Sequence, residues 1–215
     1  MRLFLLSGLL CLAQTHVTLV GDSTVAEGGG WGPGFRSALG NKSEVRNLAR
    51  NGRSSKSFRD EGAWKPAIDG SAQYILIQFG HNDCPGKGPE RETDPATTFR
   101  ANLKLYISEA LTSGATPVLV TSIVRRNFTE EGKIKADCLV PFVEQTRRLA
   151  AETRTPLIDL YSLTRELCER IGPEAIDVLG ARLPDGKPDR THLSSEGQEK
   201  IGAMAAREFL RLFPQ

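Results

Sequence analysis

The sequence predicts an α/β protein, a three-layer α/β/α sandwich built on a five-stranded parallel sheet. Five short apolar runs alternate with segments of helical period, and this alternation is typical of parallel sheets. The third and fourth runs are apolar on both faces, as strands covered by helices on both sides must be. At 215 residues, 39% hydrophobic and 25% charged, the chain is long enough for one core and short for two.

The predicted strands, in chain order, span residues 16–20, 44–48, 74–79, 117–121 and 156–160. One helical stripe precedes the fourth run and consists of Phe99, Leu103, Tyr106, Ile107, Ala110 and Leu111. A second helix ends before Pro156 and carries Val140, Val143, Thr146, Arg147 and Ala150. The last helix begins at the N-cap residue Ser194 or Ser195 and continues through Ile201, Met204, Ala205 and Phe209.

Residues 1–13 have a composition of their own. Arg2 is followed by an apolar run of about the length of a signal-peptide core, too short to span a bilayer. A buried N-terminal strand or helix is the alternative. We predict a signal peptide at 1–13 and a single domain at 14–215, secreted or periplasmic, or cytoplasmic if the signal is not functional.

Charge and cysteine content exclude some classes of protein. A net charge of +2 with dispersed basic residues argues against a nucleic-acid partner, and we expect a monomer without stable membrane association. Once Cys11 leaves with a signal peptide, Cys84, Cys138 and Cys168 allow either one disulfide with a free thiol or three thiols. No Cys-x-x-Cys pair is present, which argues against a structural zinc site.

Three residues at opposite ends of the chain carry the chemistry of acyl transfer. Ser23 follows the first predicted strand. Asp189 and His192 form a late Asp-x-x-His, which we expect in a polar loop just before the last helix. Such a set supplies a nucleophile, a general base and a carboxylate that orients the base. Ser23 taken alone is more typical of a turn or a helix N-cap, and the other residues favour catalysis. We rank below this triad a second candidate base and three other candidate carboxylates, namely His81, Asp22, Asp83 and Asp185.

Donors for an oxyanion lie after the next two strands. Gly52 follows the second run, where the absence of a side chain lets its N–H approach a ligand closely, and Asn82 follows the third. With the N–H of Ser23 they would form a three-donor oxyanion hole. Because sites gather beyond the carboxyl ends of parallel strands, we expect these groups to converge.

Four short blocks in this order resemble those of the SGNH (GDSL-type) esterases: Gly21-Asp22-Ser23, Gly52, Gly80-His81-Asn82-Asp83 and Asp189-x-x-His192. Gly-Asp-Ser-Thr at 21–24, Asn-Gly-Arg-Ser-Ser-Lys-Ser-Phe at 51–58 and Asp-Arg-Thr-His-Leu-Ser at 189–194 are similar to the rhamnogalacturonan acetylesterase branch. The resemblance implies a flavodoxin-like fold. It also implies a cofactor-free serine esterase that removes O-acetyl groups from rhamnogalacturonan or pectin through an acyl-enzyme.

Basic residues near the predicted site suggest an acidic substrate. Arg125 and Arg126 follow the fourth strand, and arginine binds carboxylates in bidentate fashion, although a solvated loop explains them equally well. His81 neighbours Asn82 and is expected to help shape the oxyanion loop. We therefore assign His81, Arg125 and Arg126 to substrate binding.

Other functions remain open at this point. A related esterase acting on lipid, thioester or aryl ester substrates would need an apolar acyl channel. The loop at 23–33 is rich in glycine rather than apolar, which argues against such a channel. A metal-dependent hydrolase would use His81, Asp83, Asp189 and His192, but no established metal-binding pattern is present. A sugar-binding module without catalysis has no feature in its favour. We predict that no metal or other cofactor is required.

Overall fold

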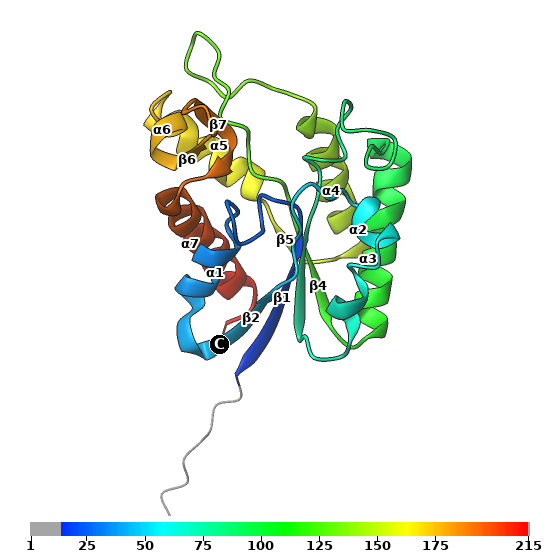
Figure 1. The fold of residues 1–215 in the computed structure, drawn as a ribbon. Coiled ribbons are helices and arrows are strands. Elements are labelled where there is room, and N and C mark those ends of the chain that lie inside the picture. Colours follow the sequence, from blue (N-terminus) through cyan, green and yellow to red (C-terminus); the bar gives the residue numbers. More distant parts are fainter. Residues whose placement is uncertain (1–13, 215) are drawn as a thin grey trace, which may run out of the picture.

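A computed structural model describes residues 14–214, so the signal peptide predicted at 1–13 lies outside the described residues. The strands form one parallel sheet in the order β2-β1-β3-β4-β5 (Figure 1). They are β1 (Thr15–Gly21), β2 (Ser43–Asn47), β3 (Tyr74–Gln78), β4 (Thr116–Val120) and β5 (Leu157–Ile158). The predicted fold class is confirmed. The fifth strand is shorter than predicted.

Helices cover both faces of the sheet (Figure 1). On one face lie α1 (Gly32–Leu39), α5 (Leu160–Ile171) and α7 (Ser195–Leu212), and on the other α2 (Ser57–Asp60), α3 (Arg100–Thr112) and α4 (Leu139–Thr153). Besides these helices and α6 (Ala175–Leu179), which is described below, there are two 3₁₀ turns (Gly40–Lys42, Lys65–Ile68) and one π-turn before α3 (Pro95–Phe99). Ser194 caps α7, as predicted, because its Oγ accepts the Gly197 N–H at 3.1 Å.

The core fills the spaces between the layers. Side chains of the central strands are fully buried, among them Leu19, Leu76 and Val118. Between the sheet and α7, Phe35 makes edge-to-face contacts with Trp31 and Phe209. Each buried aromatic or branched side chain stabilises the fold by about 1.5–3 kcal/mol relative to exposure. This packing makes the strand ends a rigid support for the loops that follow them.

A second, two-stranded sheet lies beyond the carboxyl edge of the main one. It pairs β6 (Gly180–Arg182) with β7 (Pro188–Leu193) in antiparallel fashion, next to α6 (Ala175–Leu179). The sequence prediction placed Asp189 and His192 in a loop, which is wrong, because both lie on β7. The strand reads Pro-Asp-Arg-Thr-His-Leu, without an alternating apolar pattern, and Arg126 donates hydrogen bonds to its carbonyls.

Candidate active site

Ser23 lies in a tight turn directly after β1. The carbonyl of Asp22 accepts the N–H groups of Val25 and Ala26, both at 3.1 Å, and its Oδ1 accepts the Thr24 N–H at 2.8 Å and the Thr24 hydroxyl at 2.7 Å. The Thr24 hydroxyl in turn accepts a hydrogen bond from Gln78 at 2.6 Å. These bonds fix the turn that presents Ser23 at the edge of the sheet.

The structure brings the three residues predicted as a triad together. His192 Nε2 lies 2.9 Å from Ser23 Oγ, and His192 Nδ1 lies 2.7 Å from Asp189 Oδ2. The other carboxylate oxygen of Asp189 accepts the backbone N–H groups of Thr191 at 2.8 Å and His192 at 2.9 Å. An unbroken hydrogen-bonded chain therefore runs from the carboxylate through the imidazole to the hydroxyl.

The environment of Asp189 keeps its carboxyl group ionised. Burial by itself would raise the pKa of Asp189, but hydrogen bonds from the backbone and ring of His192 and from the Thr191 N–H outweigh it, so the pKa lies below its ordinary value. A carboxylate in this place holds the imidazole in one orientation and stabilises the imidazolium that forms when the base accepts a proton.

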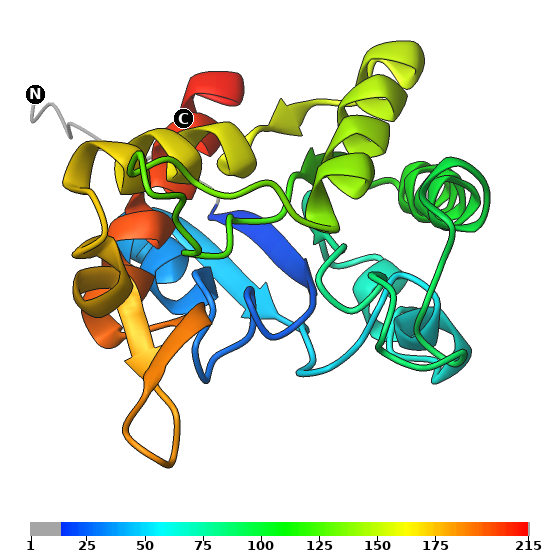
Figure 2. The same ribbon diagram turned by 90° about the horizontal axis from the view of Figure 1, so that it is seen from above.

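A glycine in the loop after β1 leaves space for the side chain of His192. Gly29 has a φ of 138°, and a Cβ atom there would lie 3.3 Å from the Cβ of His192. The carbonyl of Gly29 accepts the Leu193 N–H at 2.8 Å. In Figure 2 this loop (blue) lies beside the β6–β7 hairpin (orange). The loop that carries the serine is thereby joined to the strand that carries the histidine.

Gly52 and Asn82 lie after β2 and β3, the two neighbours of β1. The segment after β2 stays beside β1, because Arg50 N–H donates to the Gly21 carbonyl at 3.0 Å. Gly52 has a φ of 75°, in the left-handed region that favours glycine. The Asn82 side-chain nitrogen donates to the Arg53 carbonyl at 3.2 Å. In the described part of the chain this bond uses one of the two amide hydrogens, which leaves one for a ligand.

A buried carboxylate ties these two loops to each other. Asp83 accepts the Ser55 hydroxyl at 2.5 Å, the Ser55 N–H at 3.1 Å and the Thr93 hydroxyl at 2.9 Å. Ser55 is held further by the Tyr106 hydroxyl, which donates to its carbonyl at 2.9 Å. Burial raises the pKa of the Asp83 carboxyl from 3.8 to about 7. Asp83 therefore has a positioning role, which differs from the alternative catalytic carboxylate or metal ligand that the sequence suggested.

The structure corrects the assignment of His81 to substrate binding. Its side chain is only 4% exposed, and Nδ1 faces the buried Asp22 carboxylate at 3.7 Å. Burial would raise the pKa of Asp22, but the imidazole of His81 and the hydrogen bonds from Thr24 together hold it below its ordinary value. His81 therefore lies beneath the Ser23 turn and does not face the solvent.

The assignment of Arg126 is corrected for the same reason. This residue is 1% exposed, and Nη2 donates to the carbonyls of Asp189 at 2.8 Å and His192 at 2.5 Å. Nη1 reaches the Thr191 carbonyl at 3.5 Å, and the backbone N–H donates to the Arg190 carbonyl at 2.8 Å. One arginine thus contacts every carbonyl from 189 to 192, in place of a substrate.

Arg125 also forms its hydrogen bonds within the protein. Nη1 contacts Asp137 at 2.8 Å and Cys138 Sγ at 3.2 Å, and Nη2 donates to the His81 carbonyl at 3.3 Å. It joins the loop after β3 to the start of α4, the same two segments that the Cys84–Cys138 disulfide links. The predicted substrate contact is therefore replaced by a structural role. With that disulfide formed, Cys168 is a buried free thiol, which is the first of the two cysteine arrangements left open by the sequence.

The cluster considered for a metal does not form. The carboxylate of Asp83 faces Ser55 and that of Asp189 faces His192, and no group of three or more His, Cys, Asp or Glu side chains within residues 14–214 is arranged to hold a metal. Among the same residues, no helix is both long and apolar enough to cross a membrane.

Comparison with known proteins agrees with this geometry. Residues 19–200 match the model of the GDSL-like lipase/acylhydrolase family. The chain is 37% identical over 208 residues to the rhamnogalacturonan acetylesterase RhgT of Bacillus subtilis (strain 168), covering 89% of this chain and 88% of that protein. It is 30% identical over 214 residues to a rhamnogalacturonan acetylesterase of Emericella nidulans, covering 88% and 82%.

A solved structure supports the same relationship. The crystal structure of the Bacillus subtilis protein YxiM superposes with a TM-score of 0.78 at 26% identity. The match covers 93% of this chain and 57% of that one, so this chain spans little more than half of that longer protein. The order of its sequence blocks, its fold and its relatives agree, and the chain belongs to the GDSL-like lipase/acylhydrolase family.

Proposed function

We propose that this protein is a serine carbohydrate acetylesterase that removes O-acetyl groups from an acidic plant polysaccharide of the rhamnogalacturonan type. The observation that carries the chemistry is the chain of hydrogen bonds from Asp189 through His192 to Ser23, with spacings of 2.7 and 2.9 Å. The substrate class rests on two relatives that are rhamnogalacturonan acetylesterases and match most of this chain.

The geometry suits a two-step acyl transfer. Ser23 Oγ attacks the acetyl carbonyl carbon while its proton passes to His192 Nε2, and the carbonyl becomes an oxyanion. The N–H groups of Ser23 and Gly52 and the amide of Asn82 are the proposed donors to that oxyanion, each worth on the order of 3 kcal/mol in the transition state. Collapse of the intermediate expels the sugar hydroxyl, which takes the proton from His192.

Water completes the reaction. It gives one proton to His192 Nε2 as it attacks the acetyl-Ser23 ester, and collapse returns that proton to Ser23 Oγ. The product leaves as acetic acid, which ionises to acetate in solution. Through both steps Asp189 stays ionised and holds the imidazole. Each group begins and ends the cycle in the same state, so the proposed reaction needs no co-reactant beyond water.

We place the enzyme outside the cytoplasm. The Cys84–Cys138 disulfide is of a kind that persists in oxidising compartments, and the apolar run at 1–13 is typical of an export signal. A polymeric pectin would also have to be met outside the cell. Detection of the protein in the medium or periplasm of its native cells, with the first residues removed, would test this placement.

Acetate release from acetylated rhamnogalacturonan, acetylated xylan and a p-nitrophenyl ester series tests the function. We expect wild type to be fastest on rhamnogalacturonan, Ser23→Ala to be inactive on all three, and the exposed-serine control Ser37→Ala to match wild type. Activity in folded Ser23→Ala would refute the serine mechanism. Faster turnover of long acyl chains would favour the lipase or thioesterase alternative, and a requirement for zinc after chelator dialysis would favour a metal-dependent hydrolase.

A further inference from the structure

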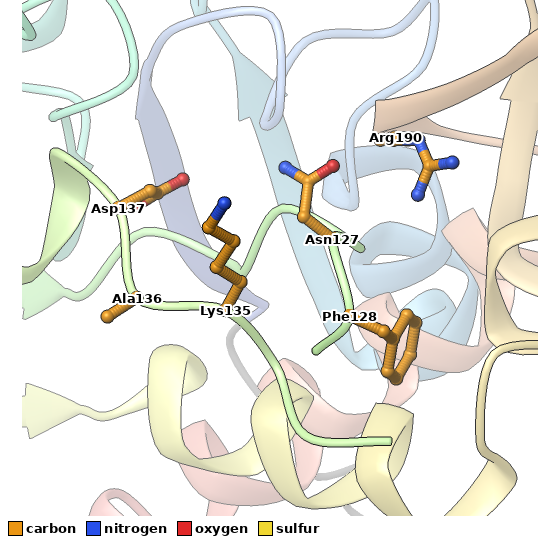
Figure 3. A pocket seen from close by; sticks show the side chains of 6 residues that line it. All are labelled: Asn127, Phe128, Lys135, Ala136, Asp137 and Arg190. Atoms are coloured by element: carbon orange, nitrogen blue, oxygen red, sulfur yellow. The ribbon is translucent and has the colours of Figure 1, made fainter. Parts of the chain in front are cut away.

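A pocket of about 380 Å³ opens beside the strand that carries the proposed base (Figure 3). It is lined by Asn127, Phe128, Lys135, Ala136, Asp137 and Arg190. Its volume falls within the range of small-ligand sites, about 300–1,000 Å³. We call it the Lys135–Arg190 pocket. None of its lining residues takes part in the proposed acyl transfer.

The pocket has an excess of positive charge. Its only acidic residue, Asp137, is already paired with Arg125 at 2.8 Å. Lys135 and Arg190 are exposed, and neither forms an ion pair with a carboxylate in the part of the chain that the structure describes. In the view of Figure 3 their charged ends lie on either side of the Asn127 amide. Two cations and an amide, with the one carboxylate of the lining already paired to Arg125, suit a carboxylate ligand.

The pocket is joined to the candidate active site on both sides. Arg190 lies between Asp189 and His192 on β7, and its Cα is at most about 7 Å from that of His192 by chain length alone. On the other side, Asp137 precedes Cys138, whose disulfide reaches Cys84 two residues after Asn82. The pocket therefore adjoins both the strand that carries the proposed base and the loop that carries Asn82.

The walls of the pocket are held by backbone hydrogen bonds. Arg126 N–H donates to the Arg190 carbonyl at 2.8 Å, and Arg190 Nη1 returns a bond to the Arg126 carbonyl at 3.2 Å. Lys135 N–H donates to the Asn127 carbonyl at 2.8 Å. The Arg190 guanidinium is therefore placed before a ligand arrives and keeps donors free for a bidentate contact.

We propose that the Lys135–Arg190 pocket binds the carboxylate of a uronic acid residue that neighbours the acetylated sugar in the polysaccharide. Arg190 makes a bidentate contact, Lys135 adds a second charge, and the ring of Phe128 supports the sugar. This inference rests on the proposed function and names how the same site selects acidic chains. It moves the acid-binding role from Arg125 and Arg126, which are engaged within the protein, to two exposed cations.

Binding to a catalytically silent protein tests the pocket apart from turnover. The probe is a deacetylated rhamnogalacturonan oligosaccharide, compared with the same oligosaccharide after reduction of its carboxyl groups, and titrated by calorimetry into Ser23→Ala at low ionic strength, where screening is weak. We expect the acidic form to bind about tenfold to a hundredfold more tightly, as one or two charge-assisted hydrogen bonds would give.

Further substitutions in the Ser23→Ala background locate the effect. Lys135→Gln and Arg190→Gln should each reduce the preference for the acidic form severalfold, and the two together should abolish it. Arg190→Lys should restore part of it, because the charge returns without the bidentate fork. The matched control is Lys133→Gln, which removes a cation on the same loop that is exposed and paired with Glu169 at 3.5 Å. It should keep the preference.

The outcomes separate this inference from the proposed function. Equal affinity for the two oligosaccharides, no binding of either, or a preference that survives in the Lys135→Gln/Arg190→Gln protein overturns the pocket assignment. Acetate release by wild type from acetylated rhamnogalacturonan decides the function independently. Release without an acid preference leaves the function standing and removes the pocket, whereas absence of release from every polysaccharide removes the function itself.

Discussion

Arg126 supports the proposed base through the backbone of β7, and its replacement by methionine measures that support. The side chain is 1% exposed and donates to the carbonyls of Asp189 at 2.8 Å and His192 at 2.5 Å. Hydrogen bonds from a charged group contribute about 1.5–3 kcal/mol each, so these two contribute about 3–6 kcal/mol. The 3.5 Å contact with Thr191 lies at the limit of hydrogen bonding and adds little.

Two effects reduce this figure. Burial lowers the pKa of the Arg126 guanidinium, which reflects the cost of holding a charge away from water, and its buried Nε has no hydrogen-bond partner in the described structure. Both costs disappear in Arg126→Met. We therefore expect the free energy of unfolding to fall by about 2–4 kcal/mol, which a domain with about 5–15 kcal/mol of stability survives.

The kinetic effect separates positioning from substrate binding. Release of the β7 carbonyls should let His192 shift relative to Ser23, and a displacement of about 1 Å can cost about a hundredfold in rate. We expect kcat to fall about a hundredfold on both p-nitrophenyl acetate and acetylated rhamnogalacturonan, with KM within about twofold. Labelling of Ser23 by a fluorophosphonate should slow in parallel, since it reads activation of the hydroxyl without the sugar.

Urea denaturation, steady-state kinetics and labelling rates on wild type, Arg126→Met and Arg126→Lys complete the assay. Lysine should recover part of the stability and rate, because its ammonium can satisfy one or two of the carbonyls. Lost stability with wild-type kcat and labelling would refute positioning and leave a purely structural arginine. A rise in KM confined to the acidic substrate would restore Arg126 as a substrate contact.

Three further predictions follow from single features of the fold. Gly29→Ala should lower kcat about tenfold and the free energy of unfolding by about 1–3 kcal/mol, because residue 29 has a φ of 138° and the new Cβ would lie 3.3 Å from the Cβ of His192. The control Gly28→Ala adds a Cβ in open space, and equal kcat in the two variants would contradict this prediction. Loss of the disulfide in Cys84→Ala/Cys138→Ala, with a sequence separation of 54, should lower the free energy of unfolding by about 4 kcal/mol in the chain-entropy model, and an unchanged urea midpoint would refute it. The pKa of Asp83, raised from 3.8 to about 7, means that its neutral form favours the folded state. The stability that this neutral form contributes is complete below about pH 4 and is lost as the pH rises to about 7, by at most about 4 kcal/mol. In urea titrations, Asp83→Asn should therefore make the free energy of unfolding depend less on pH between pH 4 and 8. The same pH dependence in wild type and Asp83→Asn would speak against this prediction.

The sequence by itself determined the sheet and the main residues of the candidate site. Buried runs such as 74–79 are apolar on both faces, and apolar periodicity is a local property that needs no knowledge of the fold. Ser23, Gly52 and Asn82 could be placed at one edge because parallel strands end on the same side. The pairing of Ser23 with the Asp-x-x-His at 189–192 followed from the chemistry that acyl transfer requires. The roles of these residues in catalysis stay predictions until the variants are measured.

Only the tertiary structure decided which polar groups face the solvent. The sequence offered Arg125, Arg126 and His81 as substrate contacts, since arginine and histidine at a strand end are usually accessible. In the fold, Arg126 is enclosed under β7, whose carbonyls lie more than 60 residues further along the chain. His81 is enclosed under the Ser23 turn, because its partner Asp22 lies nearly 60 residues earlier. Long-range hydrogen bonds leave no periodic pattern in the sequence. For the same reason β7, the tie from Asp83 to Ser55 and the charge of the Lys135–Arg190 pocket emerged only once distant segments were seen side by side.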